Sequence, residues 1–387
     1  MWFLPFLFVG LSCAARDVTS EQIHLSYHGE PDEMVVTWIT WKKVKDDSFV
    51  IYGKSADKLE HKELASNYHK YTSHGDLGLE GHVYTAKLKN LHPENRYTST
   101  ASALKSECRM FSTSNRCRTD MTDYTRDFAY NLHTNNGILG DQFFAQILPI
   151  AAFVPYMTVA GNHEHKHDFH EYKHRFAMPK NDAGTQFEWL KTDLETTRKP
   201  WIVTYMHRPM YCSAKGSQDC TTADSEYIRL GNATIRGLEQ IFNEKGVDFG
   251  FWGHKHYYER LFPVYNNKTY PQTLNVYKNA QTPVYVITGA AGNRDNHTFV
   301  SDFIPTYSAV RSPEYGYMVM HVHNSTHIHL KQLSVEQQDT VVDDLWVIKD
   351  AGYRPGVKTV DPAERMRFNR VEMEQLIKTN EGSDSEL

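Results

Sequence analysis

The chain has 387 residues, which is too long for one small module and fits two domains. Apolar residues make up 40% of the chain, including 19 Phe and 23 Tyr, so a sizeable core can form and bulk disorder is not expected. The net charge is −5 and there is no basic block, which argues against nucleic acid as a partner.

A short apolar run opens the chain at residues 2–11. Small residues that suit signal-peptidase cleavage follow it, Ser12-Cys13-Ala14-Ala15. The run is too short for a bilayer span of about 20 residues, and no second stretch of that length follows. We therefore predict a signal peptide at residues 1–15, with an uncleaved anchor as the alternative, and no membrane span. The protein is expected to be secreted or to enter the lysosomal lumen.

Export predicts an oxidising compartment, in which cysteines can pair. Without Cys13, four cysteines remain, and they allow three pairings. We predict that neighbours pair, Cys108 with Cys117 and Cys212 with Cys220. Four N-glycosylation sequons also agree with secretion, and they begin at Asn232, Asn267, Asn296 and Asn324.

Residues 17–111 have the pattern of a β-sandwich. Met34–Thr40 is rich in β-branched and aromatic residues, as strands are. The motif Leu91-x-Pro93-x-x-x-Tyr97 has the spacing of the turn and tyrosine corner of an immunoglobulin or fibronectin III sandwich. We expect this domain to carry no chemistry of its own. The polar segment 106–126 marks its boundary.

The pattern changes at residue 127, where short apolar runs begin to alternate with helix-like segments. The apolar runs are Phe153–Val159, Trp201–Met206, Val247–Trp252 and Val284–Thr288, and the helix-like segments include Gln142–Ala152, Phe187–Thr196 and Thr234–Lys245. This alternation predicts an α/β sandwich at residues 127–350, with functional groups at the C-terminal ends of its strands. Residues 351–387 are a charged tail, in which Arg365–Lys378 could form a peripheral amphipathic helix.

Four short segments carry groups typical of metal ligands at positions where a strand should end. They are Asp127-Phe-Ala-Tyr130, Gly161-Asn162-His163-Glu164, His207 after the run Trp201–Met206, and Gly253-His254-Lys255-His256. Together they supply a carboxylate, a phenol, an amide and several imidazoles. A single histidine is usually a core or surface group, but the ordered set predicts a two-metal hydrolase site.

The first two segments supply four groups, and each suits a particular role. The carboxylate of Asp127 can bridge two cations, because each of its oxygens can hold one. The phenolate of Tyr130 favours a hard, strongly acidic cation such as ferric iron, although a lone tyrosine would be interpreted as a packed side chain. Asn162 offers a neutral amide oxygen. His163 is adjacent to Asn162 and so points elsewhere, which suits binding a phosphoryl oxygen or protonating a leaving group.

Imidazoles supply the remaining groups. His207 ends an apolar run, as a ligand at a strand terminus should. Gly253 allows close approach of the backbone. His254 and His256 are two positions apart after a strand, so they can reach two neighbouring cations from one loop.

These motifs resemble those of the animal purple acid phosphatases, within the metallophosphoesterase superfamily. The resemblance covers most of residues 17–348 and rests, in order, on Asp127–Leu132, Gly161–Glu164, His207–Cys212, Gly253–Arg260 and Glu314–Tyr317. It implies a fibronectin III-like N-terminal domain. It also implies a C-terminal α/β metallophosphoesterase domain, a β-sheet sandwich flanked by helices.

The resemblance also implies the metals and the reaction. A ferric ion would be bound by Tyr130, His256 and Asp127, and a divalent ion (Zn, Mn or Fe) by Asp127, Asn162, His207 and His254. A metal-bound hydroxide would attack the phosphorus of a small phosphate monoester, and both cations would stabilise the added charge. Since ferric iron makes its bound water acidic, hydroxide would persist at low pH. His163 would contact the substrate.

The chain departs from the family in the region that precedes Asp127. The family's catalytic sheet begins with a strand ending in Gly-Asp-x-Gly, whose Asp is a ligand of the ferric ion. Gly75-Asp76-Leu77-Gly78 has these letters in the wrong context, and we interpret it as a coincidence. Thr119–Arg126 is too polar for a buried parallel strand, and Arg126 replaces the family's Gly before the bridging Asp.

A second gap follows Gly184, because Asn162 and His207 are only 45 positions apart. The departures before Asp127 and after Gly184 predict that internal segments of the family are missing from this chain, as in a splice form or an incomplete gene model. They leave open an alternative to the acid phosphatase, a catalytically impaired or dead secreted glycoprotein with only a partial divalent site. A neutral-pH phosphodiesterase is a weaker alternative, because Tyr130 and the β-sandwich argue against it.

The stretch His163–His174 contains five histidines: His163, His165, His167, His170 and His174. It could chelate a metal independently. We predict instead that only His163 is functional and that the others belong to a solvated loop.

Overall fold

The structure is a computed structural model that describes residues 19–356. The residues left out within this range are 28, 31, 45–46, 56, 75–77, 93–95, 102–108, 113–121, 125–129, 179–185, 216–219, 221–222, 234–235, 271–274 and 292–295. The chain forms two compact units, Met1–Asn181 (unit 1) and Asp182–Leu387 (unit 2). The predicted signal peptide, the segment around Cys108 and Cys117, Asp127 and the charged tail beyond residue 356 lie outside the described residues.

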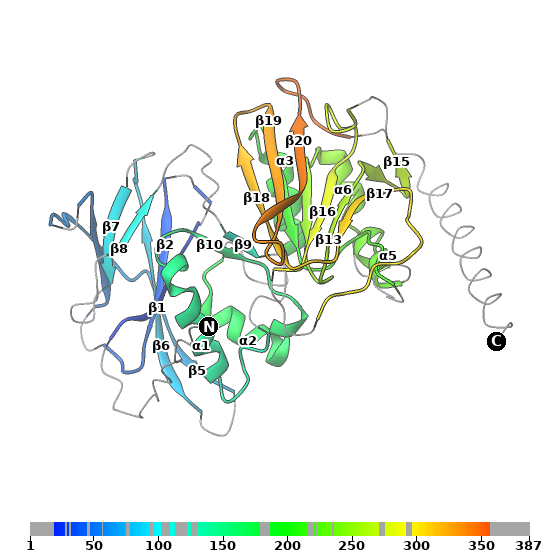
Figure 1. The fold of residues 1–387 in the computed structure, drawn as a ribbon. Helices are drawn as coiled ribbons and strands as arrows, with labels where there is room; N and C mark the ends of the chain where they lie inside the picture. Colours follow the sequence, from blue (N-terminus) through cyan, green and yellow to red (C-terminus); the bar gives the residue numbers. More distant parts are fainter. Residues whose placement is uncertain are drawn as a thin grey trace, which may run out of the picture. The chain divides into compact units, whose positions relative to one another are not determined.

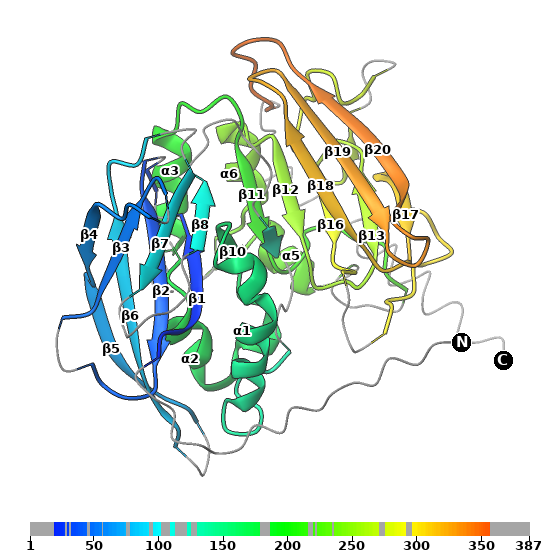
Figure 2. The same ribbon diagram turned by 60° about the vertical axis from the view of Figure 1, so that its left-hand side comes forward.

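Unit 1 contains the expected β-sandwich, built from two antiparallel sheets (Figures 1 and 2). The first sheet has the order β1-β2-β6-β5, with bounds β1 Glu21–Ser26, β2 Met34–Thr40, β6 Glu80–Leu88 and β5 Asn67–Thr72. The second has the order β4-β3-β7-β8, with bounds β4 His61–Leu64, β3 Phe49–Gly53, β7 Arg96–Ala101 and β8 Arg109–Ser112. The predicted strand Met34–Thr40 is confirmed as β2.

The core of the sandwich lies between its two sheets. Trp38 and Tyr84 stack at 5.7 Å between ring centroids, and Val50 and Leu88 are fully buried in the same cluster. The predicted tyrosine corner is present, because the buried Tyr97 hydroxyl accepts a hydrogen bond of 3.0 Å from the backbone nitrogen of His92.

A helical layer completes unit 1. Its elements are α1 Ile138–Ala151, β10 Tyr156–Thr158, the 3-10 turn η1 Asn162–Glu164 and α2 Lys166–Arg175. The predicted helix Gln142–Ala152 and strand Phe153–Val159 are thus confirmed as α1 and β10, with shifted ends. The polar segment before Asp127 was expected not to form a parallel strand. It nevertheless supplies β9, Thr122–Tyr124, which pairs in parallel with β10. This pairing is possible in a polar segment because the strand is only three residues long.

The expectation of a solvated loop at the histidine-rich stretch is wrong. From Lys166 on, the stretch folds into α2, whose backbone departs from helical geometry at three successive residues, His167, Asp168 and Phe169, with φ values of +54°, +57° and +59°. Its imidazoles hold the helix on β5 and the residues around it. His170 Nε2 donates to the carbonyl oxygen of Thr72 at 2.9 Å, and His69 Nε2 donates to that of His174 at 2.8 Å. These contacts join positions about a hundred residues apart, which the sequence pattern could not reveal.

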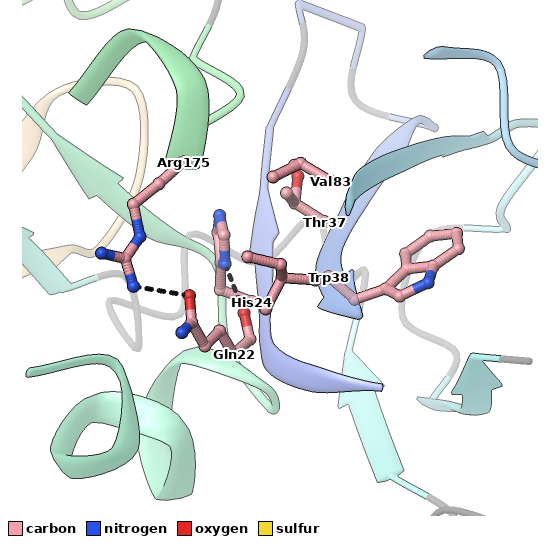
Figure 3. Close-up of a pocket in the computed structure, with 7 residues that line it drawn as sticks. Gln22, His24, Thr37, Trp38, Val83 and Arg175 are labelled. Atoms are coloured by element: carbon pink, nitrogen blue, oxygen red, sulfur yellow. Dashed lines mark hydrogen bonds between the residues drawn. The ribbon is translucent and has the colours of Figure 1, made fainter. Parts of the chain in front are cut away.

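A polar network lies buried between β1 and the helical layer (Figure 3). Arg175, 2% exposed, donates to Gln22 Oε1 at 2.8 Å and to Asp141 Oδ1 at 2.7 Å. His24 lies against the rings of Phe144 and Phe176, and its Nδ1 donates to the carbonyl oxygen of Gln22 at 2.9 Å. Its Nε2 faces a cavity of about 10 Å³ and has no partner among the described atoms. The site can accommodate an uncharged imidazole but not a cation.

Unit 2 is an α/β sandwich of two sheets and a layer of helices (Figures 1 and 2). The main sheet has the order β11-β12-β16-β13-β17, with bounds β11 Val203–Met206, β12 Phe249–Trp252, β16 Val284–Thr288, β13 Tyr258–Leu261 and β17 Ser308–Ser312. The strands β11, β12 and β16 are parallel to one another. The strand β13 pairs antiparallel with both β16 and β17. The second sheet, β18-β19-β20, consists of Gly316–Val322, His327–Ser334 and Thr340–Ile348. A small hairpin joins β14, Val264–Tyr265, to β15, Lys268–Thr269.

Each face of the main sheet packs on a different layer. Phe249 and Val286 pack with Ile328 and Val347 of the second sheet. On the other face, Trp252 and Ile287 pack with the helices α3 Gln186–Thr196, α5 Ala223–Arg229 and α6 Glu239–Lys245. The predicted strands and the helix Phe187–Thr196 are confirmed with small shifts at their ends. The predicted helix Thr234–Lys245 is confirmed only in its second half, because α6 begins at Glu239. None of the helices in the described ranges combines the length and apolarity that crossing a membrane would take.

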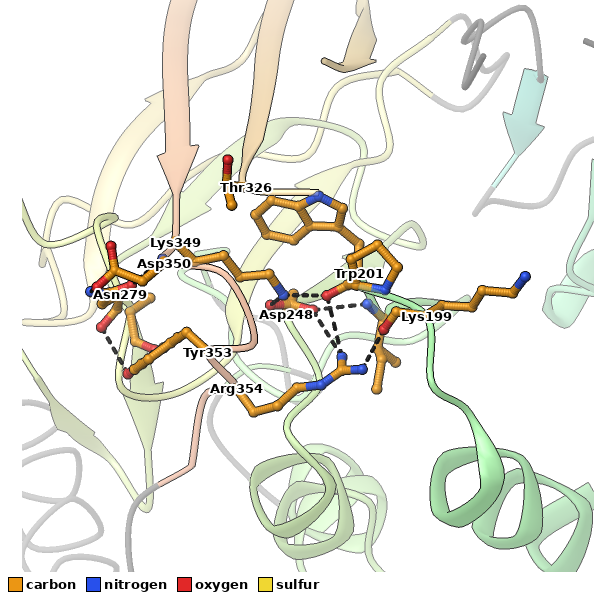
Figure 4. Close-up of polar contacts among 12 residues, drawn as sticks. Lys199, Trp201, Asp248, Asn279, Thr326, Lys349, Asp350, Tyr353 and Arg354 are labelled. Carbon is orange, nitrogen blue, oxygen red and sulfur yellow. Dashed lines mark hydrogen bonds and ion pairs between the residues drawn. The ribbon is translucent and has the colours of Figure 1, made fainter. Parts of the chain in front are cut away.

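A buried ion pair fastens the residues after β20 to the start of the main sheet (Figure 4). Lys349 Nζ lies 2.6 Å from Asp248 Oδ1, with side-chain exposures of 4% and 3%. The other oxygen of Asp248 accepts a bond of 2.8 Å from the backbone nitrogen of Ile202, and Lys349 lies over the ring of Trp201. Burial raises the pKa of Asp248 and lowers that of Lys349, so each charge depends on its partner.

We predict that acid destabilises unit 1 through His24. Burial, and secondarily the Arg175 cation, lowers the pKa of His24 from 6.5 to about 4. The unfolded chain therefore binds more protons between these pH values, and stability present above pH 6.5 is lost as pH falls to about 4. The loss is of the order of 3 kcal/mol. His24→Gln, which keeps a donor for Gln22, should flatten the pH dependence of the unfolding free energy measured in denaturant. An unchanged slope in this range would contradict the assignment.

We predict that Lys349→Met destabilises unit 2 by about 3 kcal/mol, because it leaves the buried Asp248 carboxylate with only the Arg354 guanidinium, 3.7 Å away, as a cation. The double variant Asp248→Asn with Lys349→Met removes both charges and keeps an acceptor for Ile202. It should be more stable than Lys349→Met alone. Denaturant unfolding curves measure both differences. A cost below about 1 kcal/mol for the single variant would show that the ion pair is dispensable.

Candidate metal centre

The part of the predicted site that unit 1 contributes begins at the turn after β10. Asn162 and His163 lie in η1, which is held by the buried Glu164. The Glu164 Oε2 atom accepts a bond of 2.8 Å from the backbone nitrogen of Gly161. The backbone nitrogen of Glu164 donates in turn to the Gly161 carbonyl oxygen at 3.3 Å, so the backbone is fixed on both sides of Asn162. The two predicted functional side chains therefore start from a rigid turn.

Tyr130 and His163 lie side by side in unit 1. Their ring centroids are 4.6 Å apart, and His163 Nδ1 is 3.2 Å from Asn131 Oδ1. Because an amide oxygen only accepts, Nδ1 carries the proton, which leaves Nε2 as the atom with a lone pair. Tyr130 and Asn131 have φ values of +41° and +72°, a conformation that such residues adopt rarely and that is enriched at functional sites. The role of Asn131 in orienting His163 was not foreseen from the sequence.

The part that unit 2 contributes is an imidazole pair. His207 directly follows β11 and His254 follows β12 after Gly253. The backbone nitrogen of Gly253 donates to the carbonyl oxygen of His207 at 3.0 Å, which continues the pairing of the two strands. His207 Nε2 and His254 Nδ1 are 3.1 Å apart, and His254 has a φ of +63°. The structure thus brings these two predicted ligands together.

The spacing of this pair fits a divalent metal. Two nitrogens that are each about 2.05 Å from a zinc ion lie about 2.9 Å apart at a right angle and about 3.4 Å apart at the tetrahedral angle. The 3.1 Å between His207 Nε2 and His254 Nδ1 is the length of a hydrogen bond between the two rings, and it also lies between these limits. Neutral imidazoles also suit Zn and Fe. The residues present are therefore compatible with a shared cation.

His256 is held by the segment that begins at Asn296. Its Nδ1 donates to the carbonyl oxygen of Asn296 at 3.0 Å, and its backbone nitrogen donates to Thr298 Oγ1 at 2.9 Å. Thr298 returns a backbone bond of 3.2 Å to the carbonyl oxygen of His256. A carbonyl on one ring nitrogen leaves Nε2 for a metal, which is how ligating histidines are usually oriented. Sequence reasoning assigned no such role to Asn296 or Thr298.

The complete predicted set draws on both units. Asp127, the predicted bridging ligand, lies outside the described residues. Within the described ranges, no group of three or more His, Cys, Asp or Glu side chains is gathered to hold a metal ion. The described residues therefore form two partial ligand sets. Tyr130 and Asn162 belong to unit 1, and the imidazoles of His207, His254 and His256 belong to unit 2.

The segment after His207 carries a disulfide bond between Cys212 and Cys220, with 4.9 Å between their Cα atoms. The Cys212 carbonyl oxygen accepts a bond of 3.0 Å from the Tyr307 hydroxyl. Among the sequon residues, Asn232, Asn296 and Asn324 are exposed and Asn267 is partly exposed. All four therefore lie at the surface of unit 2.

Three family models match the chain. "Purple acid Phosphatase, N-terminal domain" matches residues 20–115, and "Calcineurin-like phosphoesterase" matches residues 127–258. "Iron/zinc purple acid phosphatase-like protein C" matches residues 282–344. A sandwich followed by an α/β unit with ligands at its strand ends is thus a metallophosphoesterase of the calcineurin-like class.

Relatives support the narrower assignment. "Acid phosphatase type 7" of Mus musculus is 34% identical to this chain, with 86% of this chain and 91% of that protein aligned. The protein of the same name from Danio rerio is 33% identical, with 85% and 91% aligned. The chain belongs to the purple acid phosphatase family, within the metallophosphoesterase superfamily. A purple acid phosphatase from yellow lupin (Lupinus luteus) seeds shares its fold, with 19% identity and a TM-score of 0.73 over 89% of this chain and 78% of that one.

The alignments also show that this chain is internally shorter than its relatives. The alignment with the mouse protein is 403 positions long, although it takes in only 86% of the 387 residues, or about 333 of them. About 70 positions of the alignment therefore have no residue of this chain. This difference supports the prediction that internal segments of the family are missing here.

We predict that His254→Gln lowers the metal content of the purified protein by about one equivalent, because the amide cannot replace an imidazole in the pair with His207. Elemental analysis after loading with iron and zinc gives the content. His329→Gln is the matched control, because this histidine of β19 bonds to Asp344 instead. Equal metal content in wild type and His254→Gln would rule out the pair as a ligand set.

Proposed function

We propose that this protein is an exported acid phosphatase that hydrolyses phosphate monoesters at a dinuclear site holding Fe(III) and a divalent ion, Zn, Mn or Fe. The observation that carries the proposal is the separation of 3.1 Å between His207 Nε2 and His254 Nδ1 at the ends of two neighbouring parallel strands. The rest of the donor set stands in the order of the family's motifs.

The assignment of ligands follows the resemblance. Tyr130, His256 and Asp127 would hold the ferric ion, and Asp127, Asn162, His207 and His254 would hold the divalent ion. When bound, the two ions would supply Lewis-acid activation of water and of the phosphoryl group. The protein's own part is to orient the donors, and the bonds of His256 to the Asn296 carbonyl and of Gly253 to His207 contribute to this orientation.

His163 is proposed as the residue that meets the substrate. Its Nδ1 donates to Asn131, so Nε2 is the atom that faces the substrate. In the imidazolium form, in which both nitrogens carry a proton, Nε2 would donate to a phosphoryl oxygen or give its proton to the leaving group. Its ring lies against Tyr130, which limits its rotation. Asn131 is therefore a positioning residue in this proposal.

The remaining assignments belong to the same proposal. Residues 1–15 would be a signal peptide, 17–111 a fibronectin III-like domain, 127–350 the catalytic domain and 351–387 a tail. Secretion or entry into a lysosomal lumen would agree with the disulfide Cys212–Cys220 and with the four surface sequons. The partner would be a small phosphate ester and not a nucleic acid, in line with the net charge of −5.

A second candidate function is a catalytically impaired glycoprotein that keeps only part of the divalent site. The shorter alignment favours it, because about 70 aligned positions of the mouse relative are missing. The family's Gly-Asp-x-Gly strand has no recognisable counterpart in its place before Asp127. A ferric site that lacks one carboxylate binds its ion less tightly.

We expect the iron- and zinc-loaded protein to hydrolyse 4-nitrophenyl phosphate at acidic pH and to show a visible tyrosinate-to-iron absorption. Tyr130→Phe should abolish the absorption and lower kcat/KM by at least about tenfold, because the ferric ion loses its phenolate ligand. Tyr227→Phe, at a tyrosine of α5 that is 44% exposed, is the matched control.

Two outcomes separate the candidates. Hydrolysis with two metals per chain supports the enzyme. No hydrolysis from acid to neutral pH, with one metal or none per chain and no visible absorption, would establish the impaired protein instead.

A further inference from the structure

A cluster of histidines, separate from the proposed metal centre, joins α2 to β5 and the residues that follow it in unit 1. Its members, named here the histidine cluster, are His69, His74, His167, His170 and His174. Their rings form one continuous series of contacts. The distances between ring centroids are 4.0 Å for His74 and His167, 4.3 Å for His74 and His170, and 4.1 Å for His170 and His174. The series ends at His69, 5.3 Å from His174.

The histidine cluster is not arranged to chelate a metal. Within the described ranges, no three of its imidazoles are gathered where an ion could bind. Backbone carbonyl oxygens also engage ring nitrogens, because His170 donates to Thr72, His69 to His174 and His174 to His170, at 2.8 to 2.9 Å. Since an imidazole ionises near neutral pH, the property that remains to the cluster is a change of charge.

Few carboxylates are placed to balance that charge. Glu171 faces His167 and His170, but its Oε2 atom already accepts bonds from the Tyr71 hydroxyl at 2.6 Å and from Arg175 at 3.3 Å. The remaining ionisable groups on the surrounding elements are the pairs Asp141–Arg175, Asp168–Lys173 and Glu80–Lys70, and the side chains of His133 and Lys166. One shared carboxylate cannot offset several imidazolium ions in contact with one another.

The first turn of α2 depends on the histidine cluster. Its backbone is left-handed at His167, Asp168 and Phe169. Such a run of residues other than glycine is strained and persists only where surrounding contacts impose it. The stack of His74 on His167 is one of these contacts. This turn is therefore the part of α2 that opens most readily when the imidazoles repel one another.

We propose that the histidine cluster is an acid-sensitive latch, which holds the start of α2 on β5 while its imidazoles are neutral and releases it when several of them are protonated. Like charges at the observed ring spacings repel. Because α2 directly follows η1, which carries Asn162 and His163, the release also frees one side of that turn. The proposal holds whether or not the protein is an enzyme.

The direction of the response follows from the surroundings of the rings. Loss of hydration comes first and repulsion by a neighbouring histidine adds to it, and together they lower the pKa of His69, His167 and His170 below the usual 6.5. The open form therefore binds more protons than the closed form as the pH falls through this range. The latch is closed at neutral pH and loses stability below about pH 6.5.

Hydrogen exchange of the full-length protein, followed by mass spectrometry, measures the release. After correction for the intrinsic effect of pH on exchange, the opening equilibrium of Lys166–Arg175 should rise at least about tenfold between about pH 7 and about pH 5. The strand β2, Met34–Thr40, reports global unfolding of unit 1. It should stay more protected than α2 at both pH values, because the release is local.

The double variant His74→Gln with His167→Asn removes two rings of the series. Both side chains are exposed, and asparagine tolerates the left-handed backbone at position 167, so the variant is expected to fold. Its opening equilibrium should change less than about threefold over the same pH range. His61→Gln is the matched control, because this exposed histidine belongs to β4 of the other sheet, and it should keep the wild-type response.

The comparison isolates the histidine cluster, because His24 is intact in all of these chains and its own response to acid is common to them. An acid response of wild type below about threefold, or one in which α2 and β2 open together, would overturn the proposal. So would a double variant whose response equals that of wild type. The measurement needs no turnover and no added metal, so its failure and that of the proposed function are distinguishable.

Discussion

The parallel pairing of β11 with β12 is the constraint on which the candidate metal-binding edge of unit 2 depends. The register pairs Met206 with Trp252, so the residues that follow the two strands leave at the same edge of the sheet. Phe249 and Phe251 of β12 pack on the second sheet, while Trp252 packs on the helices. A slip of one residue would exchange these two faces. The positions of His207 and His254 are therefore set by the core, and the loops only carry them.

The two units achieve rigidity by different means. In unit 2, the strands that carry the imidazoles are tied at their other ends by Asp248, through its bonds to Ile202 and Lys349. In unit 1, Tyr130 and His163 stand on turns held by Glu164 and by left-handed backbone at Tyr130. Strain of this kind persists only where the surroundings impose it. Burial lowers the pKa of His24, so acid destabilises unit 1, although the family is named for its activity in acid.

Local patterns predicted most elements, and long-range contacts explain what they missed. Met34–Thr40 and Val284–Thr288 alternate or run apolar over a strand's length, so their bounds follow from the sequence. The helix α2 was missed because its histidines bond to Thr72 and pack near His69, about a hundred positions away. The donors of the site were recognisable by residue type and spacing. Asn131 and Thr298 were not, because an Asn or Thr that orients a histidine has no signature of its own.

The missing segments would affect the two proposed metal sites unequally. The divalent set keeps both its imidazoles, and their strands pair without help from the segments that are missing. The proposed ferric set lacks the carboxylate of the family's Gly-Asp-x-Gly motif, so iron binding would depend more strongly on Tyr130 and His256. His256 in turn depends on Asn296 and Thr298. The segment that begins at Asn296 would therefore help to hold the weakened ferric half of the proposed site in place.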